Sequence, residues 1–228
     1  MALPAKLVLD FDPLDFRYPI ALETSRKHFH KWGRMTHPMK AAIVQDINRG
    51  VDGHRVSVMR TQATGWLYDQ DHEQMYKLSK KTGKLVQLET TAPVEKLSRS
   101  FVEAEHWQMG LYGPGGHYLP HRDAFDPENM PSNAWGLDRL WVGNRIATVM
   151  FYLSELVGGS TAFPNMGVAV TPRKGSAVFW HNLDRYGNQS RLSLHGACPT
   201  ALGIKWVSNK WIREGAQIWK MPCRGSVF

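Results

Sequence analysis

The sequence contains no long hydrophobic run. Its apolar runs are far shorter than the roughly 20 residues that a membrane-spanning helix needs, so we expect no membrane span. The segment Met1–Asp12 is short and acidic near its end, which argues against a signal peptide there. The protein is therefore either not secreted or a fragment that lacks its leader, and we favour the fragment.

Cysteine is also scarce, because Cys198 and Cys223 are the two cysteines of the chain. They are either unrelated buried thiols or one disulfide that ties the C-terminal tail to the core. A loop of about 25 residues closed by such a bond contributes roughly 3 kcal/mol in the chain-entropy model. So small a supply of thiols argues against a closed structural zinc site, which usually takes cysteine ligands.

The motifs typical of nucleic-acid binding are missing as well. The formal net charge of +8 could suit nucleic acid, an anionic ligand or solubility alone. The basic residues are scattered, except near Lys77–Lys84. We therefore expect no nucleic-acid partner, and we find no internal repeat or low-complexity tract.

The residues that are present suit one substantial domain. With 228 residues and 43% hydrophobic residues, the chain can bury one large core. Nine tryptophans and 20 glycines suit a β-rich fold with many turns. We expect a single domain over residues 1–228, with a supporting region at about 1–104, a core at about 105–212 and a tail at 213–228.

The first hundred residues predict a mixed region. Helical composition marks Ala21–Phe29, Met39–Asn48 and Pro93–Val102, whereas Arg55–Met59 alternates like a short strand. The polar, lysine-rich segment Asp69–Lys84 ends in what we interpret as an exposed turn. That segment is either a loop over a site or a solvated surface excursion.

The rest of the chain predicts strands. Short β-type runs, separated by glycine and proline, occupy His117–Asp123, Arg145–Leu153, Val168–Thr171, Ser176–Trp180, Leu192–Cys198 and Ile204–Ile212. Regular short strands with turn signals indicate a sandwich, a barrel or a jelly roll.

The motif His121-Arg122-Asp123 suggests chemistry. Residues i and i+2 of a strand face the same side, so His121 and Asp123 would project together. His195, in a later β-type run, is the candidate third ligand, although it could equally be an ordinary core or surface histidine. Two histidines and one carboxylate on one face of a metal are typical of iron(II) enzymes that bind an organic cosubstrate and oxygen.

Lys205 is a candidate for binding an anionic ligand. It shares one face of its expected strand with Val207 and Trp211, which predicts an inward-facing lysine. A buried lysine is unfavourable unless an anion pairs with it, and a dicarboxylic cosubstrate would supply one. The alternative is a lysine on the exposed face of an edge strand.

The sequence resembles the collagen-type prolyl 4-hydroxylases. The resemblance rests on an ordered set of motifs, which are Tyr112–Asp123, Gly143–Thr148, Phe151–Ser154, Gly158–Pro164, Pro172–Leu183, His195–Pro199 and Lys205–Trp211. They span roughly residues 105–212, about half of the chain.

The resemblance implies a fold, a reaction and a set of cofactors. The expected fold is α+β but mainly β, with a double-stranded β-helix (jelly-roll, cupin-like) core and supporting N-terminal helices. The expected reaction is the hydroxylation of peptidyl proline to 4-hydroxyproline, with succinate and CO2 as coproducts. It uses Fe(II), 2-oxoglutarate and O2, with L-ascorbate keeping the iron reduced.

The resemblance also implies roles for residues of this chain. His121, Asp123 and His195 would hold the metal, and Lys205 would pair with the distal carboxylate of 2-oxoglutarate. Tyr112 and Thr161 would be hydroxyl partners of the cosubstrate. Tyr118, Arg145 and Trp211 would lie near the reacting proline. Cys198 and Cys223 match a disulfide pair of the family in position.

Some expectations concern partners and location. The resemblance implies a proline-rich or collagen-like peptide substrate, a protein disulfide isomerase subunit and the lumen of the endoplasmic reticulum. The chain departs from the family at Arg122, Leu194 and Arg213, which puts the substrate preference in question. Two alternatives stay open: a related oxygenase that acts on another protein, against which Lys205 counts because such enzymes typically have arginine there, and a degenerate, non-catalytic binding module.

Overall fold

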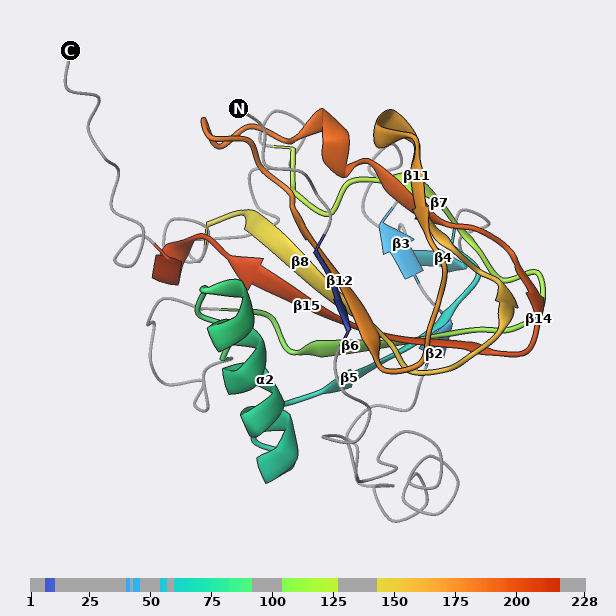
Figure 1. Cartoon of the computed structure of the whole chain (residues 1–228), viewed down its shortest axis with the longest axis horizontal. Helices are drawn as coiled ribbons and strands as arrows, with labels where there is room; N and C mark the ends of the chain where they lie inside the picture. Colours follow the sequence, from blue (N-terminus) through green and yellow to red (C-terminus); the bar gives the residue numbers. More distant parts are fainter. Residues whose placement is uncertain are drawn as a thin grey trace.

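The structure of the protein is a computed structural model, in which we describe residues 7–10, 40–41, 43–45, 54–56, 60–91, 104–126 and 143–217. Its largest sheet has the strand order β1-β12-β8-β15-β6-β5-β2, and all pairings are antiparallel (Figure 1). The bounds of these strands are Leu7–Asp10 (β1), Ser176–His181 (β12), Arg145–Tyr152 (β8), Lys205–Arg213 (β15), Trp107–Tyr112 (β6), Ala63–Leu67 (β5) and Lys40–Ala41 (β2).

A second antiparallel sheet has the order β11-β10-β13-β7. Its strands are Val168–Val170 (β11), Thr161–Phe163 (β10), His195–Ala197 (β13) and Tyr118–His121 (β7). Two short pairs complete the strands: Val157–Gly158 (β9) with Thr200–Leu202 (β14), and Ile43–Gln45 (β3) with His54–Val56 (β4). Three 3-10 turns cover Pro164–Met166 (η1), Arg191–Ser193 (η2) and Gly215–Gln217 (η3).

The inner faces of the two sheets pack against each other. From the large sheet, Tyr152, Trp180 and Val207 are almost fully buried, and they meet Phe163 of β10. The ring centroids of Phe163 and Trp180 are 5.4 Å apart, in an edge-to-face arrangement. This pairing of antiparallel sheets confirms the predicted double-stranded β-helix core and the mainly β class.

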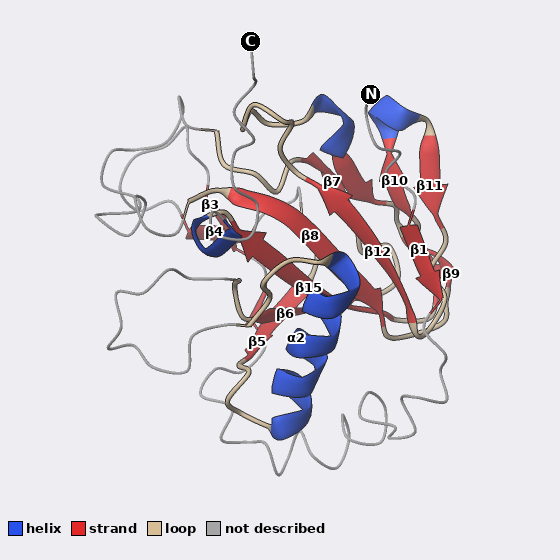
Figure 2. Ribbon diagram, turned by 60° about the vertical axis from the view of Figure 1, so that its left-hand side comes forward, coloured by secondary structure: helices blue, strands red, loops and turns tan. Residues whose placement is uncertain are grey.

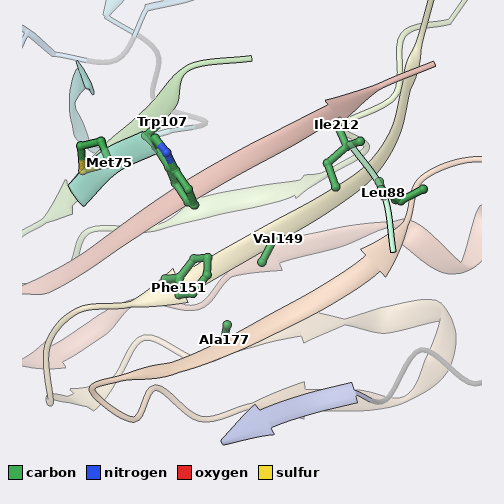
Figure 3. Packing of buried hydrophobic residues seen from close by; sticks show 8 residues of the cluster. Met75, Leu88, Trp107, Val149, Phe151, Ala177 and Ile212 are labelled. Atoms are coloured by element: carbon green, nitrogen blue, oxygen red, sulfur yellow. The ribbon is translucent and has the colours of Figure 1, made fainter. Parts of the chain in front are cut away.

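The outer face of the large sheet carries helix α2, which spans Glu73–Val86 (Figure 2). Met75 of the helix belongs to a buried cluster with Trp107, Val149 and Phe151 (Figure 3). Successive residues of a strand point to opposite sides. On β8, Val149 and Phe151 therefore pack toward the helix, whereas the intervening Met150 belongs to the inner cluster. None of the described helices is long and apolar enough to cross a membrane.

A buried ion pair also lies on the helix side of the large sheet. Nζ of Lys210, on β15, is 3.2 Å from Oδ1 of Asp69, and both side chains are fully buried. The hydroxyl of Ser79, on α2, donates to the same carboxylate oxygen at 2.8 Å. The ammonium group also lies 4.9 Å from the ring centroid of Trp107. These contacts connect the helix to the sheet.

We expect Lys210→Met to lower the free energy of unfolding by about 3–5 kcal/mol, because it leaves the Asp69 carboxylate buried without its cation. Urea denaturation would measure the change. Lys77→Met is the matched control, since Lys77 pairs with Glu73 on the exposed side of the same helix and should leave the midpoint unchanged. Equal changes in the two variants would contradict the stabilising role of the buried pair.

Two predictions for the first hundred residues were wrong. Residues 40–41 and 43–45 are strands, not part of a helix over Met39–Asn48, because β2 pairs with β5 and β3 pairs with β4. The segment Asp69–Lys84 is not a loop or surface excursion that ends in an exposed turn, since it buries Asp69 and contributes most of α2. In both segments, pairing or packing with distant residues overrides the local composition.

Other predictions for this region stay untested. Ala21–Phe29 and Pro93–Val102 lie outside the described residues, whereas β4 overlaps the strand predicted at Arg55–Met59. Cys198 forms no disulfide with any described residue, and Cys223 lies outside the described residues, so their disulfide remains a prediction. The division of the chain near residues 104 and 213 remains one too.

Candidate metal centre

Two histidines and one carboxylate meet on the small sheet. His121, the last residue of β7, lies directly opposite His195, the first residue of β13. Asp123 follows in a bend just after β7, so the strand is shorter than predicted. Nε2 of His121 is 3.6 Å from Oδ1 of Asp123, and Nε2 of His195 is 3.7 Å from Oδ2. These three residues offer ligand atoms within 4.8 Å of one another, which one metal ion could share.

Each histidine is oriented by a main-chain carbonyl. Nδ1 of His121 lies 2.9 Å from the carbonyl oxygen of Leu119, and Nδ1 of His195 lies 2.8 Å from that of Ser193. A carbonyl oxygen can only accept, so Nδ1 carries the proton in both rings. The lone pair is then on Nε2, which faces Asp123. This orientation is typical of metal-binding histidines.

The charges also suit a metal. Burial alone raises the pKa of the Asp123 carboxyl, but His195 and His121 outweigh it, and the net pKa lies well below the ordinary value. Burial lowers the pKa of His195. A carboxylate and a neutral imidazole are the forms that coordinate divalent metals, and no cysteine among the described residues joins them. The donor set therefore fits iron(II), as the sequence predicted.

Two buried residues that the sequence reasoning missed support Asp123. The hydroxyl of Thr148, on β8, donates to Oδ2 of Asp123 at 2.8 Å. The side-chain amide of Asn182 donates to that hydroxyl at 2.8 Å. Thr148 is 1% exposed and Asn182 is fully buried. A lone threonine in the apolar run Ile146–Tyr152 was the signal that could have revealed this connection.

Lys205 lies in the same cavity as this centre, and it is 1% exposed. Its Nζ donates to the main-chain oxygen of Gly159 at 2.6 Å. No carboxylate among the described residues forms an ion pair with it. Burial lowers the pKa of Lys205 to about 8. A buried cation with one neutral acceptor is unfavourable, so the site favours an anionic ligand.

Hydroxyl groups surround Lys205. Tyr112 pairs with it across β6 and β15, and the Tyr112 ring centroid is 5.3 Å from Nζ. Burial raises the pKa of Tyr112 to about 12, so its hydroxyl stays neutral and can donate. Thr161 accepts a hydrogen bond from the Tyr152 hydroxyl at 2.7 Å, which leaves the proton of Thr161 available for another acceptor. Sequence reasoning missed Tyr152.

The three residues expected near the reacting proline do not all line the cavity. Tyr118 lines it and stacks on His121 with 3.6 Å between ring centroids. Trp211 lines it too and is 5% exposed. Arg145 lies 3.8 Å from the Trp211 ring centroid, and Glu105 accepts two hydrogen bonds from its guanidinium at 2.6 and 2.7 Å. Arg145 therefore contacts the Trp211 ring but does not line the cavity itself.

One cavity thus contains most of the candidate residues. The empty space inside it is about 390 Å³, which includes the part open to solvent. Arg60, which lies 4.7 Å from the Tyr118 ring centroid, also lines the cavity and was not predicted as a site residue. The predicted residues that line it are Tyr112, Tyr118, His121, Asp123, Thr161, His195, Lys205 and Trp211.

Comparisons with known proteins agree with this chemistry. Residues 107–213 match the family model described as "2OG-Fe(II) oxygenase superfamily". Bovine prolyl 4-hydroxylase subunit alpha-1 is 47% identical over 121 residues, which cover 53% of this chain and 22% of the relative. Prolyl 4-hydroxylase subunit alpha-1 of Caenorhabditis elegans is 37% identical over 165 residues, which cover 72% of this chain and 27% of the relative. The chain spans only about a quarter of these relatives.

Two solved structures share the fold. A viral collagen prolyl hydroxylase from Paramecium bursaria Chlorella virus-1, in a 2OG complex, has a TM-score of 0.52 and 26% identity, covering 68% of this chain and 80% of that one. A prolyl-4-hydroxylase from Pseudomonas putida has a TM-score of 0.56 and 18% identity, covering 90% of this chain and 89% of that one. The second likeness supports the fold alone.

Proposed function

We propose that this chain hydroxylates peptidyl proline with 2-oxoglutarate as cosubstrate, which the match of residues 107–213 to the 2OG-Fe(II) oxygenase superfamily supports. The observation that carries the proposal is the buried Lys205, which has no carboxylate partner among the described residues and lies in the same cavity as the two-histidine, one-carboxylate cluster. The product would be 4-hydroxyproline, with succinate and CO2 released.

One group of residues would hold the metal, and another would bind the distal carboxylate of the cosubstrate. His121, Asp123 and His195 would hold Fe(II), which supplies the oxidation when it is bound together with 2-oxoglutarate and O2. Lys205 would pair with the carboxylate far from the metal through a charge-assisted hydrogen bond. Tyr112 and Thr161 would donate their hydroxyl protons to the same carboxylate. Ascorbate would keep the iron reduced, as is typical of the family.

The aromatic wall would receive the proline. Tyr118 and Trp211 line the cavity, and Arg145 fixes the Trp211 ring from behind. Proline-rich peptides have a preformed extended helix, which aromatic grooves bind with little loss of entropy. The named relatives are prolyl hydroxylases, which supports proline as the target. A collagen-like substrate, a protein disulfide isomerase partner and the lumen of the endoplasmic reticulum follow from the resemblance alone.

A turnover assay tests this function. With Fe(II), 2-oxoglutarate, ascorbate and O2, a peptide of Pro-Pro-Gly repeats should gain one oxygen atom for each 2-oxoglutarate that is converted to succinate and CO2. Mass spectrometry of the peptide and quantification of succinate measure both products, and an Ala-Ala-Gly peptide is the control. Succinate without peptide oxidation would favour an oxygenase for another target. No succinate under any condition would favour a non-catalytic binding module.

A further inference from the structure

Asn182 has a hydrogen-bonding arrangement that packing alone does not explain. Its side chain is fully buried at the end of β12, and its Nδ2 donates to the hydroxyl of Thr148. Its Oδ1 is buried and has no hydrogen-bond partner in the part of the chain that the structure describes. An unsatisfied buried acceptor destabilises the folded protein, so we look for a role of Asn182 other than stability.

Hydrogen-bond direction explains why the amide stays in this orientation. Thr148 has one proton, and it is donated to Oδ2 of Asp123, a carboxylate that can only accept. The threonine oxygen can then only accept, so the group that faces it must be a donor. Nδ2 meets that requirement, whereas an amide turned the other way would compete for the proton. Because the hydroxyl of Thr148 donates its hydrogen bond to Asp123, the amide of Asn182 must present Nδ2, and its Oδ1 is left without a partner among the described residues.

We infer that Asn182 is a positioning residue for the metal centre, acting through Thr148 to fix the rotation of the Asp123 carboxylate. This inference rests on the proposed iron site. The main chain of Asn182 contributes a second connection, since its oxygen accepts from the amide of Ser190 at 2.9 Å. Ser190 caps the N-terminus of η2, and the carbonyl of Ser193 at the end of this turn orients His195. One residue therefore connects to two of the three candidate ligands.

The chain from Asn182 to Asp123 predicts a defined pattern of metal affinities. Thr148→Val keeps the shape of the side chain and removes the hydroxyl, so it should weaken Fe(II) binding about 10- to 100-fold. Asn182→Ala should have an effect in the same range, and it leaves the main-chain connection to Ser190 intact. Thr148→Ser retains the hydroxyl and should bind within about twofold of the parent chain. The double variant should bind no more weakly than the weaker single variant, because both changes remove one connection.

Equilibrium dialysis against Fe(II) under argon, on the full 228-residue chain, measures these affinities. Thr82→Val is the matched control, because Thr82 is equally buried but its hydroxyl donates to the carbonyl of Leu78 within α2. Unchanged affinity in Thr148→Val, or losses that multiply in the double variant, would overturn the inference. If Asn182→Ala does not fold, Thr148→Val and Thr148→Ser decide alone. A parent chain that binds no Fe(II) would instead contradict the proposed function.

Discussion

Asp123→Ala should abolish both Fe(II) binding and turnover. The carboxylate is the one acidic ligand of the cluster, and it faces Nε2 of both histidines. Two neutral imidazoles alone would leave the charge of the cation unbalanced in a buried site. Turnover should fall by at least about a thousandfold, to the background of the assay, because the cosubstrate chemistry needs the metal. Metal analysis after dialysis and succinate release measure the two losses.

Asp184→Ala provides a matched control for that variant. Asp184 is a carboxylate in the exposed turn at residues 184–188, where it accepts hydrogen bonds from the backbone of Tyr186 and Asn188. Its replacement should leave iron binding unchanged. The thermal midpoint of metal-free Asp123→Ala should remain near that of the metal-free parent, because the change removes a buried charge as well as its contacts. Full iron binding in folded Asp123→Ala would show that the ligand assignment is wrong.

Lys205→Met should raise the dissociation constant for 2-oxoglutarate about 100-fold, which corresponds to the roughly 2–3 kcal/mol of a charge-assisted hydrogen bond. Methionine is similar in length and lacks the charge. The metal-free variant should also unfold at a higher temperature than the parent, since it removes a buried ammonium group. Calorimetric titration with 2-oxoglutarate and a thermal melt measure the two changes.

A second ligand isolates the interaction at Lys205. 2-Oxopentanoate has the same carbon chain as 2-oxoglutarate but lacks the distal carboxylate. It should bind the parent and Lys205→Met with similar, weak affinity. Lys84→Met, on the exposed side of α2, should bind both ligands as the parent does. Equal binding of 2-oxoglutarate by the parent and Lys205→Met would contradict the assigned role of Lys205.

The pH dependence of binding follows from the same lysine. Burial lowers the pKa of Lys205 to about 8, and the protonated ammonium is the form that pairs with a carboxylate. The affinity of the free protein for 2-oxoglutarate should therefore fall as the pH rises through about 8. In Lys205→Met the affinity should not fall in this pH range. This variant therefore distinguishes the deprotonation of Lys205 from that of other groups in the site.

The strands and the site were the most predictable parts of this chain. Short β-type runs marked β8 and β15, and the spacing within His121-Arg122-Asp123 already placed two side chains near each other. The pairing of His121 with His195 was not predictable, because it depends on β7 lying beside β13, far away in the sequence. Inward-facing Lys205 followed from alternation, whereas its lack of a carboxylate partner among the described residues needed the structure.

The errors share one physical cause. Helix α2 was missed because its exposed lysines dominate the local composition, and its buried face includes Ser79 and Thr82, which are not apolar. Asn182 was missed because its role depends on a hydrogen bond to Thr148, on a neighbouring strand. Polar groups that act through buried partners leave little pattern in the sequence. Their roles become visible only when the direction of each hydrogen bond is considered.

Strand β15 carries two buried lysines, Lys205 and Lys210, whose positive charges are balanced in different ways. Lys210 has its counter-ion within the chain, in Asp69, so that side of the strand is complete as soon as the protein folds. Lys205 has no carboxylate partner among the described residues, and in the proposed function 2-oxoglutarate supplies its counter-ion. Because Lys210 pairs on one face of β15 and Lys205 lines the cavity on the other, few positions of this strand can be substituted without loss. During divergence, we expect new substrate preferences to arise outside β15, around the exposed Arg122 and the half-buried Leu194, while this strand changes slowly.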